Sequence, residues 1–143
     1  MISIKVEGLD EVRARLDKIA SQKMRDDINR AASGMAYANV IKHFSEQSSQ
    51  EGKWQPWSDE YRKRMRARGR AGNRILQDTG ALRQSIKPGV DKDGAYVLAD
   101  SEYAAAHNYG SREQGIPQRE FMYIDDATVG KIEDYIVEKI EAS

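Results

Sequence analysis

The sequence predicts a single-domain α+β fold, in which N-terminal helices pack on a small antiparallel sheet and a C-terminal helix completes the domain. Apolar residues recur every three or four positions over residues 9–47 and again over 129–140, which indicates helices at both ends of the chain. Between them, residues 85–99 contain two turn signals and a strand-like run. A length of 143 residues fits one core, so we treat residues 1–143 as one domain.

The first third of the chain is predicted to form a strand and two helices. Residues 2–6 alternate between apolar and polar types, as in a half-buried strand that Gly8 ends. A helix is expected over residues 9–19, with acidic residues in its first turn. Ser21 can cap a longer helix that runs to about residue 47. Its small residues over 31–38 suit packing in the core, and they would also allow a close subunit contact.

The middle of the chain alternates between loops and short helices. Residues 45–52 are polar and indicate a loop, after which Ser58 can cap a basic helix that runs to about Arg68. Residues 78–80 are predicted to form a turn that caps a short helix through Leu82. A hairpin follows over residues 85–99, with Asp93-Gly94 as its turn.

The last third is less regular until its final helix. Residues 103–108 are compatible with a strand, with coil or with a short helix, and the sequence leaves this open. Residues 110–118 contain glycine and proline and predict a loop. Asp125 or Asp126 is expected to start a helix whose apolar face includes Ile132 and Ile136.

Composition excludes several classes of function. Lys and Arg number 23 and Asp and Glu number 23, so a global electrostatic field for nucleic acid or membrane is not expected. The absence of cysteine excludes disulfides, thiol catalysis and thiolate metal sites. The N-terminus lacks the apolar core of a signal peptide, and no stretch reaches membrane-spanning length. We expect a soluble chain made in cytoplasm.

The two histidines are the obvious catalytic candidates, and neither has a convincing partner. His43 is predicted to lie on the surface near the end of a helix. His107 has Asp100 and Ser101 nearby in sequence, but their order does not give the roles of a catalytic triad. Two isolated histidines do not supply the ligand spacing of a zinc site, and neither a calcium loop nor a phosphate loop is present. The sequence therefore predicts no enzyme, no metal and no cofactor.

A basic segment over residues 62–74 is the strongest local charge feature and a candidate for a flexible arm. It contains seven Lys and Arg residues and no acidic residue. One interpretation is salt-dependent, sequence-independent phosphate contact with DNA. The other, which we favour, is contact with an acidic protein surface. No aromatic residue follows Tyr61 within the segment, which argues against base stacking.

Large aromatic residues and arginine also mark candidate binding positions. Trp54 and Trp57 bracket Pro56 in a loop before a helix, and Arg119 precedes Phe121. Each can stabilise its own fold, and each can anchor a subunit contact, because Trp, Tyr and Arg dominate binding hot spots. The predicted subunit or partner interface comprises Trp54, Trp57, Arg62, Arg64, Arg66, Arg68, Arg70, Arg74, Tyr103, His107, Tyr109 and Arg119.

Four short motifs, in order, resemble those of the phage virion morphogenesis proteins, also called tail completion proteins, of contractile-tailed phages and Mu-like prophages. The first is a Gly-x-x-Trp-x-Pro loop in the family, to which Gly52, Trp54 and Pro56 correspond with one residue fewer between Gly and Trp. The others are an Ile-Leu-x-x-Thr-Gly-x-Leu-x-x-Ser-Ile string over residues 75–86, Tyr-Ala-x-x-His-x-x-Gly over residues 103–110, and Ile-Pro-x-Arg-x-Phe over residues 116–121. Each motif alone has low specificity, whereas their order with these gaps is fairly specific.

The resemblance implies a tail-terminator-like fold and a structural role without chemistry. It implies tail completion or head–tail joining by a ring-shaped homo-oligomer, a hexamer by analogy with sixfold tails, at the end of the tail tube. Tail tube and head–tail connector proteins would be its partners, in the virion and, during assembly, in the cytoplasm of the bacterial host. Glu120 stands where the family often has Pro, and residues 64–74 are more basic than the family pattern. The alternative function is a DNA-contacting module that uses Arg62–Arg74.

Overall fold

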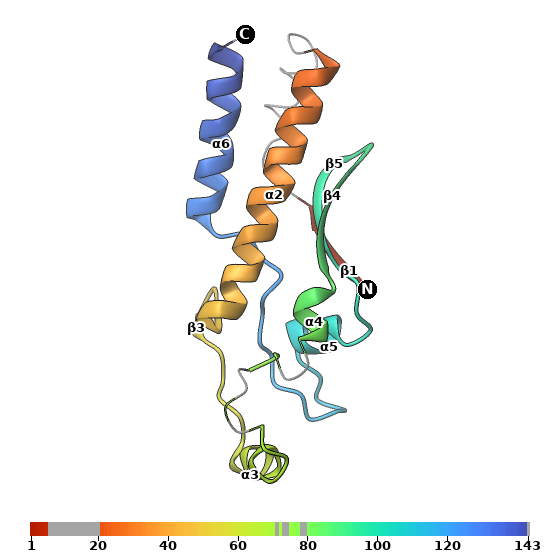
Figure 1. Cartoon of the computed structure of the whole chain (residues 1–143), viewed down its shortest axis with the longest axis vertical. Helices are drawn as coiled ribbons and strands as arrows, with labels where there is room; N and C mark the ends of the chain where they lie inside the picture. Colours follow the sequence, from red (N-terminus) through yellow and green to blue (C-terminus); the bar gives the residue numbers. More distant parts are fainter. Residues whose placement is uncertain (6–20, 71, 73–74, 78–79, 143) are drawn as a thin grey trace.

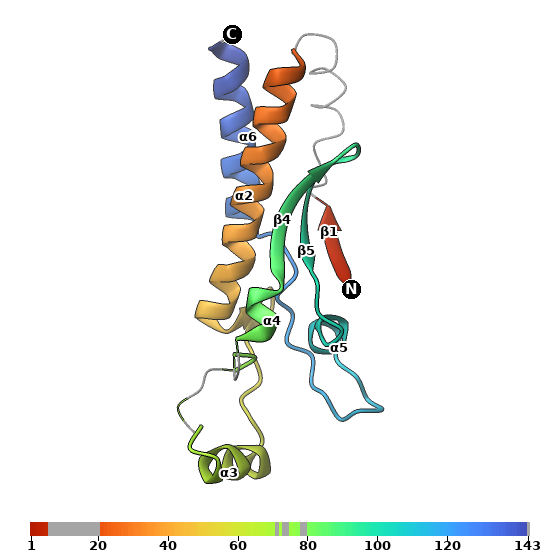
Figure 2. The same cartoon turned by 45° about the vertical axis from the view of Figure 1, so that its right-hand side comes forward.

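The computed structural model describes residues 1–5, 21–70, 72, 75–77 and 80–142, which form an elongated molecule (Figure 1). The long helix α2 (Gln22–Glu46) lies between helix α6 (Asp126–Glu141) on one side and a three-stranded sheet on the other. Three shorter helices lie toward one end of the molecule, namely α3 (Asp59–Ala67), α4 (Ala81–Gln84) and α5 (Ala104–Tyr109) (Figure 2). The α+β prediction is confirmed, whereas the helix predicted over residues 9–19 lies outside the described residues.

The sheet consists of β1 (Ile2–Lys5), β4 (Ile86–Asp91) and β5 (Gly94–Ala99) in the order β1-β5-β4, with both pairings antiparallel. The predicted hairpin is confirmed, but its turn was predicted one residue too late. Asp91 pairs with Gly94, so Lys92 and Asp93 form the turn. The Asp91 side chain explains the shift, because its Oδ1 accepts a hydrogen bond from the Asp93 N–H at 2.8 Å.

The helix starts predicted at Ser21 and Ser58 are confirmed by side-chain caps, whereas α4 begins after Gly80 without one and residues 78–79 of its predicted turn lie outside the described residues. The hydroxyls of Ser21 and Ser58 accept hydrogen bonds from the backbone N–H groups three residues later, each at 3.2 Å. At the other end of α2, Gln47 adopts a left-handed conformation with φ 50°, and its N–H donates to the carbonyl oxygens of the last turn. The polar loop that follows contains a minimal hairpin of β2 (Ser48–Ser49) and β3 (Gly52–Lys53).

Apolar burial is concentrated along the two faces of α2. One cluster joins α2 to the sheet and to the chain entering α6; its fully buried members include Val40, Phe44, Val97 and Phe121. A second cluster joins the first half of α2 to α6 through Ile28, Ile132 and Ile136. The predicted apolar face of α6 therefore packs on α2. None of the described helices is both long and apolar enough to cross a bilayer.

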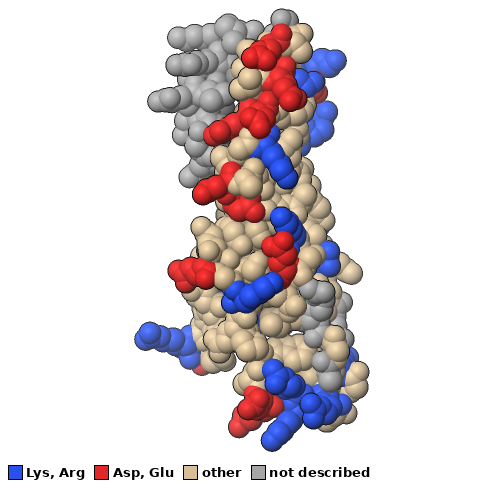
Figure 3. Space-filling view, turned by 90° about the vertical axis from the view of Figure 1, so that its left-hand side faces the viewer, with Lys and Arg blue, Asp and Glu red and all other residues tan. Residues whose placement is uncertain are grey.

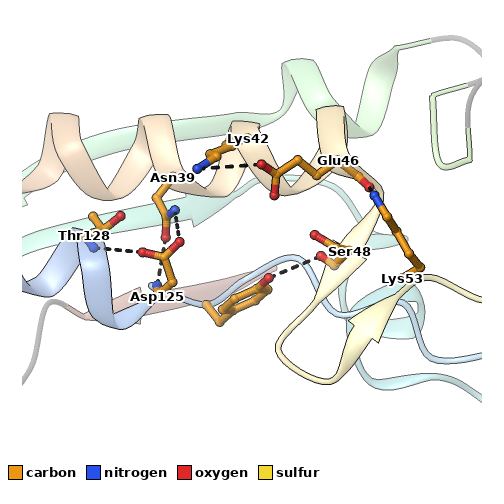
Figure 4. A network of polar contacts seen from close by, with 8 residues as sticks. Asn39, Lys42, Glu46, Ser48, Lys53, Asp125 and Thr128 are labelled. Atoms are coloured by element: carbon orange, nitrogen blue, oxygen red, sulfur yellow. Dashed lines mark hydrogen bonds and ion pairs between the residues drawn. The ribbon is translucent and has the colours of Figure 1, made fainter.

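A polar contact fixes the start of α6 against α2 (Figure 4). The Asn39 side chain donates to Asp125 Oδ2 at 2.8 Å and accepts from the Asp125 N–H at 2.9 Å. Asp125 Oδ1 also caps α6 by accepting from the Thr128 N–H at 2.8 Å. Burial raises the pKa of the Asp125 carboxyl group, but the hydrogen bonds from Thr128 and Asn39 outweigh it, so that this pKa lies below its usual value.

The prediction that His43 lies on the surface is wrong. Only 2% of its surface is exposed, and its ring stacks on Tyr123 with 3.7 Å between ring centroids. Its Nε2–H donates to the Tyr123 carbonyl oxygen at 3.1 Å. Sequence reasoning missed this because the stacking partner lies on the segment leading to α6, far along the chain. Burial is the main reason that the pKa of His43 is below its usual value.

Candidate functional site

The four motifs lie together at the end of the molecule that carries α3 and α5. One hollow, of about 590 Å³, is lined by residues from every motif and from α3. It is walled mainly by apolar and aromatic side chains, with a few polar groups among them. The lining residues from the motifs are Gln55, Pro56, Trp57, Leu76, Ala81, Leu82, Tyr103, His107, Ile116, Pro117 and Arg119, and α3 adds Tyr61 and Arg64.

Trp54, from the first motif, attaches the loop before α3 to the core. Its indole is 5% exposed and packs edge-on against Phe44, with ring centroids 5.6 Å apart. The indole Nε1–H donates to the Glu120 carbonyl oxygen at 2.9 Å. These contacts are made within the chain, so the structure assigns Trp54 to the fold rather than to an exposed surface. The same bond joins the first and fourth motifs.

Arg119 is buried and acts as a clamp on the same loop. Its guanidinium donates from Nε to the Gln55 carbonyl oxygen at 2.8 Å and from Nη2 to the Pro56 carbonyl oxygen at 3.2 Å. Burial lowers the pKa of Arg119 from its ordinary value, but a guanidinium keeps its proton in proteins. Arg119 is only 8% exposed, so its positive charge is stabilised by the dipoles of the two main-chain carbonyl groups rather than by water. Its role visible in the structure is to position the Trp57 loop over the hollow.

Asn108 was not among the predicted site residues, yet it organises the third and fourth motifs. It is 2% exposed, and its Oδ1 accepts from the N–H groups of Phe121 and Met122 at 3.0 and 2.9 Å. Gly110 turns the chain after α5 with φ 79°, where a Cβ would lie 3.1 Å from the Gln118 backbone nitrogen. The sequence signal was weak, because it showed only an asparagine two residues before Gly110.

His107 lines the hollow without the geometry of a catalytic base. Its Nδ1 is buried and has no hydrogen-bond partner within the described part of the chain. Burial is the main reason that the pKa of His107 is below its usual value, and the nearby charge of Arg119 lowers this pKa further. The ring is therefore neutral at neutral pH. Ser101 also lines the hollow, but its hydroxyl accepts from the Tyr103 N–H and is not hydrogen-bonded to His107.

Part of the predicted interface is exposed, and of this part Trp57, Arg64 and Tyr103 line the hollow. Trp57 is half-buried and packs edge-on against Tyr61, over whose ring the Arg64 guanidinium lies 5.5 Å from the centroid. Tyr103 and Tyr109 are each 63% exposed. The basic side chains on and after α3 are exposed, namely Arg62, Arg64, Arg66, Arg68 and Arg70. Arg74 lies outside the described residues. The interface role of these residues stays a prediction.

The site offers no constellation for metal binding in the residues that the structure describes, where no group of three or more His, Asp or Glu side chains could hold an ion. Its chemistry is that of a binding surface: an apolar hollow with aromatic walls, a neutral imidazole and a basic helix at the rim. The polar groups that bring the motifs together bond to main-chain atoms, which suits a loop cluster of fixed shape.

Comparison with known proteins agrees with this geometry. The chain is 26% identical, over 140 residues, to the putative capsid assembly protein G of Escherichia phage Mu, an alignment that covers 92% of this chain and 90% of that protein. No solved structure matches the chain. The model of the phage virion morphogenesis family matches residues 8–141. The resemblance seen in the four motifs is thereby confirmed: the chain belongs to the phage virion morphogenesis family and has a role in phage structure or assembly.

Proposed function

We propose that this protein completes the phage tail or joins head to tail, and that it does so as a ring of identical chains at the end of the tail tube. Its partners would then be further copies of itself, the tail tube protein and head–tail connector proteins. It would reside in the tail or at the head–tail joint of the virion, and act without catalysis.

The convergence of the four motifs on one hollow is the observation that carries this proposal. A non-enzymatic adaptor needs a preformed surface, because ordering loops on binding costs free energy that weakens the contact. Here Trp54 and Arg119 join the loop before α3 to the fourth motif, and Asn108 joins α5 to the same motif. The exposed aromatic rings of Tyr103 and Tyr109 at the same end are residue types that anchor interfaces.

The test is assembly with and without the tail tube protein. Sedimentation velocity should detect a closed oligomer of the purified chain, or one that forms only when tube protein is added. In a phage lacking this gene, electron microscopy should show tails that fail to join heads, and the wild-type gene should restore them. A chain that stays monomeric both alone and with tube protein would contradict the proposal. Normal virions in a phage that lacks the gene would contradict it as well.

The exposed arginines of α3 favour DNA contact as the second candidate function. Five exposed cations occur between Arg62 and Arg68, and phosphate contacts of this kind release counterions. Binding to duplex DNA should then weaken steeply with salt and be lost when these side chains are neutralised. Salt-independent binding, or none, would remove this candidate.

A further inference from the structure

The solvent face of α6 carries an acidic surface that has no partner among the residues that the structure describes. Helical periodicity places five carboxylates on this face, and all are exposed: Asp126, Glu133, Asp134, Glu138 and Glu141. Val137 lies among them and is 51% exposed. Figure 3 shows acidic side chains gathered over the upper part of this face of the molecule. We call these six residues the α6 acidic face.

None of these carboxylates forms an ion pair or a side-chain hydrogen bond with another residue of the described chain. Residues 126–141 hold five acidic residues and two lysines, a formal charge of −3. One of those lysines, Lys139, lies over the Tyr135 ring at 5.7 Å. An acidic rim around one exposed apolar residue is complementary to a basic surface that has an apolar depression.

The opposite end of the molecule has that surface. Residues 59–70 hold six basic and two acidic residues, a formal charge of +4. Arg64 lies at the wall of the hollow, and Arg68 follows one helical turn later on the same side. The hollow itself supplies apolar lining from Trp57, Leu82 and Ile116. In Figure 3 basic side chains are most concentrated at the lower end and acidic side chains over the upper part, with some of each sign at both ends.

We propose that the α3 arginines and the adjoining hollow of one copy receive the α6 acidic face of the next copy. The two surfaces lie toward opposite ends of one elongated chain, so they meet only between copies (Figure 1). Each copy thus offers α3 to one neighbour and α6 to the other. Such a heterologous contact closes into a ring when its rotation allows. This inference rests on the proposed ring and specifies which surfaces build it.

This head-to-tail contact joins two different surfaces, whereas other contacts would join a surface to an identical copy of itself. A contact of α3 with α3, or of α6 with α6, would oppose like charges. The head-to-tail contact instead places cations opposite carboxylates at every junction. Opposite potentials steer association and select the register of the two surfaces. Val137 would enter the hollow as the apolar anchor at the centre of the contact.

The test is a pair of charge reversals that fail alone and recover together. One variant carries Arg64→Glu and Arg68→Glu, and the other carries Asp134→Lys and Glu138→Lys. Each alone opposes like charges at every junction, so its self-association should weaken at least about tenfold at low salt. In an equimolar mixture of the two variants, each reversed α3 can meet a reversed α6, and each native α3 can meet a native α6, so opposite charges face each other at every junction again. Assembly by sedimentation velocity should therefore return toward the wild-type level.

A matched control reverses two exposed lysines that belong to neither surface, with Lys87→Glu and Lys92→Glu on β4 and its turn. This variant changes net charge as much as the arginine variant does, and it should assemble like the wild type. Circular dichroism checks that all variants are folded. All measurements are made with and without tail tube protein, because the ring can require the tube.

The outcomes separate this inference from the proposed function. If either reversed variant assembles like the wild type, or if the two folded variants fail to assemble when mixed, the proposed contact between α3 and α6 is wrong. The proposed ring is not contradicted by either result. If the wild type never assembles, the proposed function fails and the contact fails with it. If reversal of the arginines leaves assembly intact but abolishes binding to duplex DNA, DNA is the partner of α3, which overturns the inference.

Discussion

The two ends of this molecule are stabilised in different ways. The end formed by α2, α6 and the sheet is held by apolar burial along a long helix, with Val40, Ile132 and Val97 almost fully buried. The end that carries the motifs is held by hydrogen bonds from a few buried polar side chains to main-chain atoms. Packing tolerates volume-conserving change, whereas a polar clamp depends on donor and acceptor positions. The second arrangement suits loops whose shape must be fixed for binding.

The largest expected effect comes from the residue where both regions meet. Phe44 is fully buried and packs against Trp54 and Phe121, with the Phe121 ring centroid 5.0 Å away. Phe44→Ala should lower the free energy of unfolding by about 3–5 kcal/mol, because it leaves a cavity at this junction. Urea denaturation measures the loss, and both ends should unfold together. A loss below about 1 kcal/mol would show that the junction is not a single core.

The motif end should be sensitive to the loss of a single acceptor. Asn108→Ala leaves two buried N–H groups without their partner and should cost about 2–3 kcal/mol in the free energy of unfolding. The control Asn29→Ala changes a half-buried asparagine on α2 for which no side-chain hydrogen bond is described, and should cost less than about 0.5 kcal/mol. Equal losses for the two variants in urea denaturation would contradict the difference between the regions.

The Arg119 clamp should act locally. Arg119→Met removes both hydrogen bonds to the loop carbonyls while keeping an unbranched apolar stem, at a cost of about 1–3 kcal/mol. Amide hydrogen exchange should accelerate over residues 54–58 and change little in α6. Assembly should weaken, because the wall of the hollow then loses its fixed position. Unchanged exchange over residues 54–58 would show that the loop is held by other contacts.

The smallest effect is expected from pH. Burial lowers the folded-state pKa of both His43 and His107 below their usual value near 6.5. Both rings are therefore neutral in the fold, and their contribution to stability is present above pH 6.5 and is lost as the pH falls through the lowered pKa values. Thermal unfolding temperatures should decline below pH 6.5, and His43→Gln together with His107→Gln should reduce that decline. An undiminished decline in the double variant would contradict this assignment.

Local signals explain why most of the fold was predictable. The caps at Ser21, Ser58 and Asp125 and the apolar periodicity of α2 and α6 are properties of neighbouring residues, and each appears in the structure as expected. The hairpin was also predictable, except that the side chain of Asp91 moved its turn by one residue. These features need no knowledge of the distant chain.

The site could be predicted only in part, because its polar contacts join distant segments. The sequence singled out Arg119, but its acceptors are carbonyls of Gln55 and Pro56, which any residues could supply. Asn108 and His43 were missed for the same reason, since their partners become neighbours only in the fold. Trp54 and Arg119 were predicted as interface residues, and the structure buries both in their own chain. The exposed residues around the hollow retain that prediction.

The central claim is that the end carrying the four motifs is the surface used in assembly. Hydrogen exchange of the free chain, compared with the chain in assembled tails, tests it most directly. We expect slower exchange over α3, over residues 55–58 and over residues 103–119 on assembly, with little change in the buried half of α2. Protection confined to the sheet and α2, with the motif end unchanged, would contradict it.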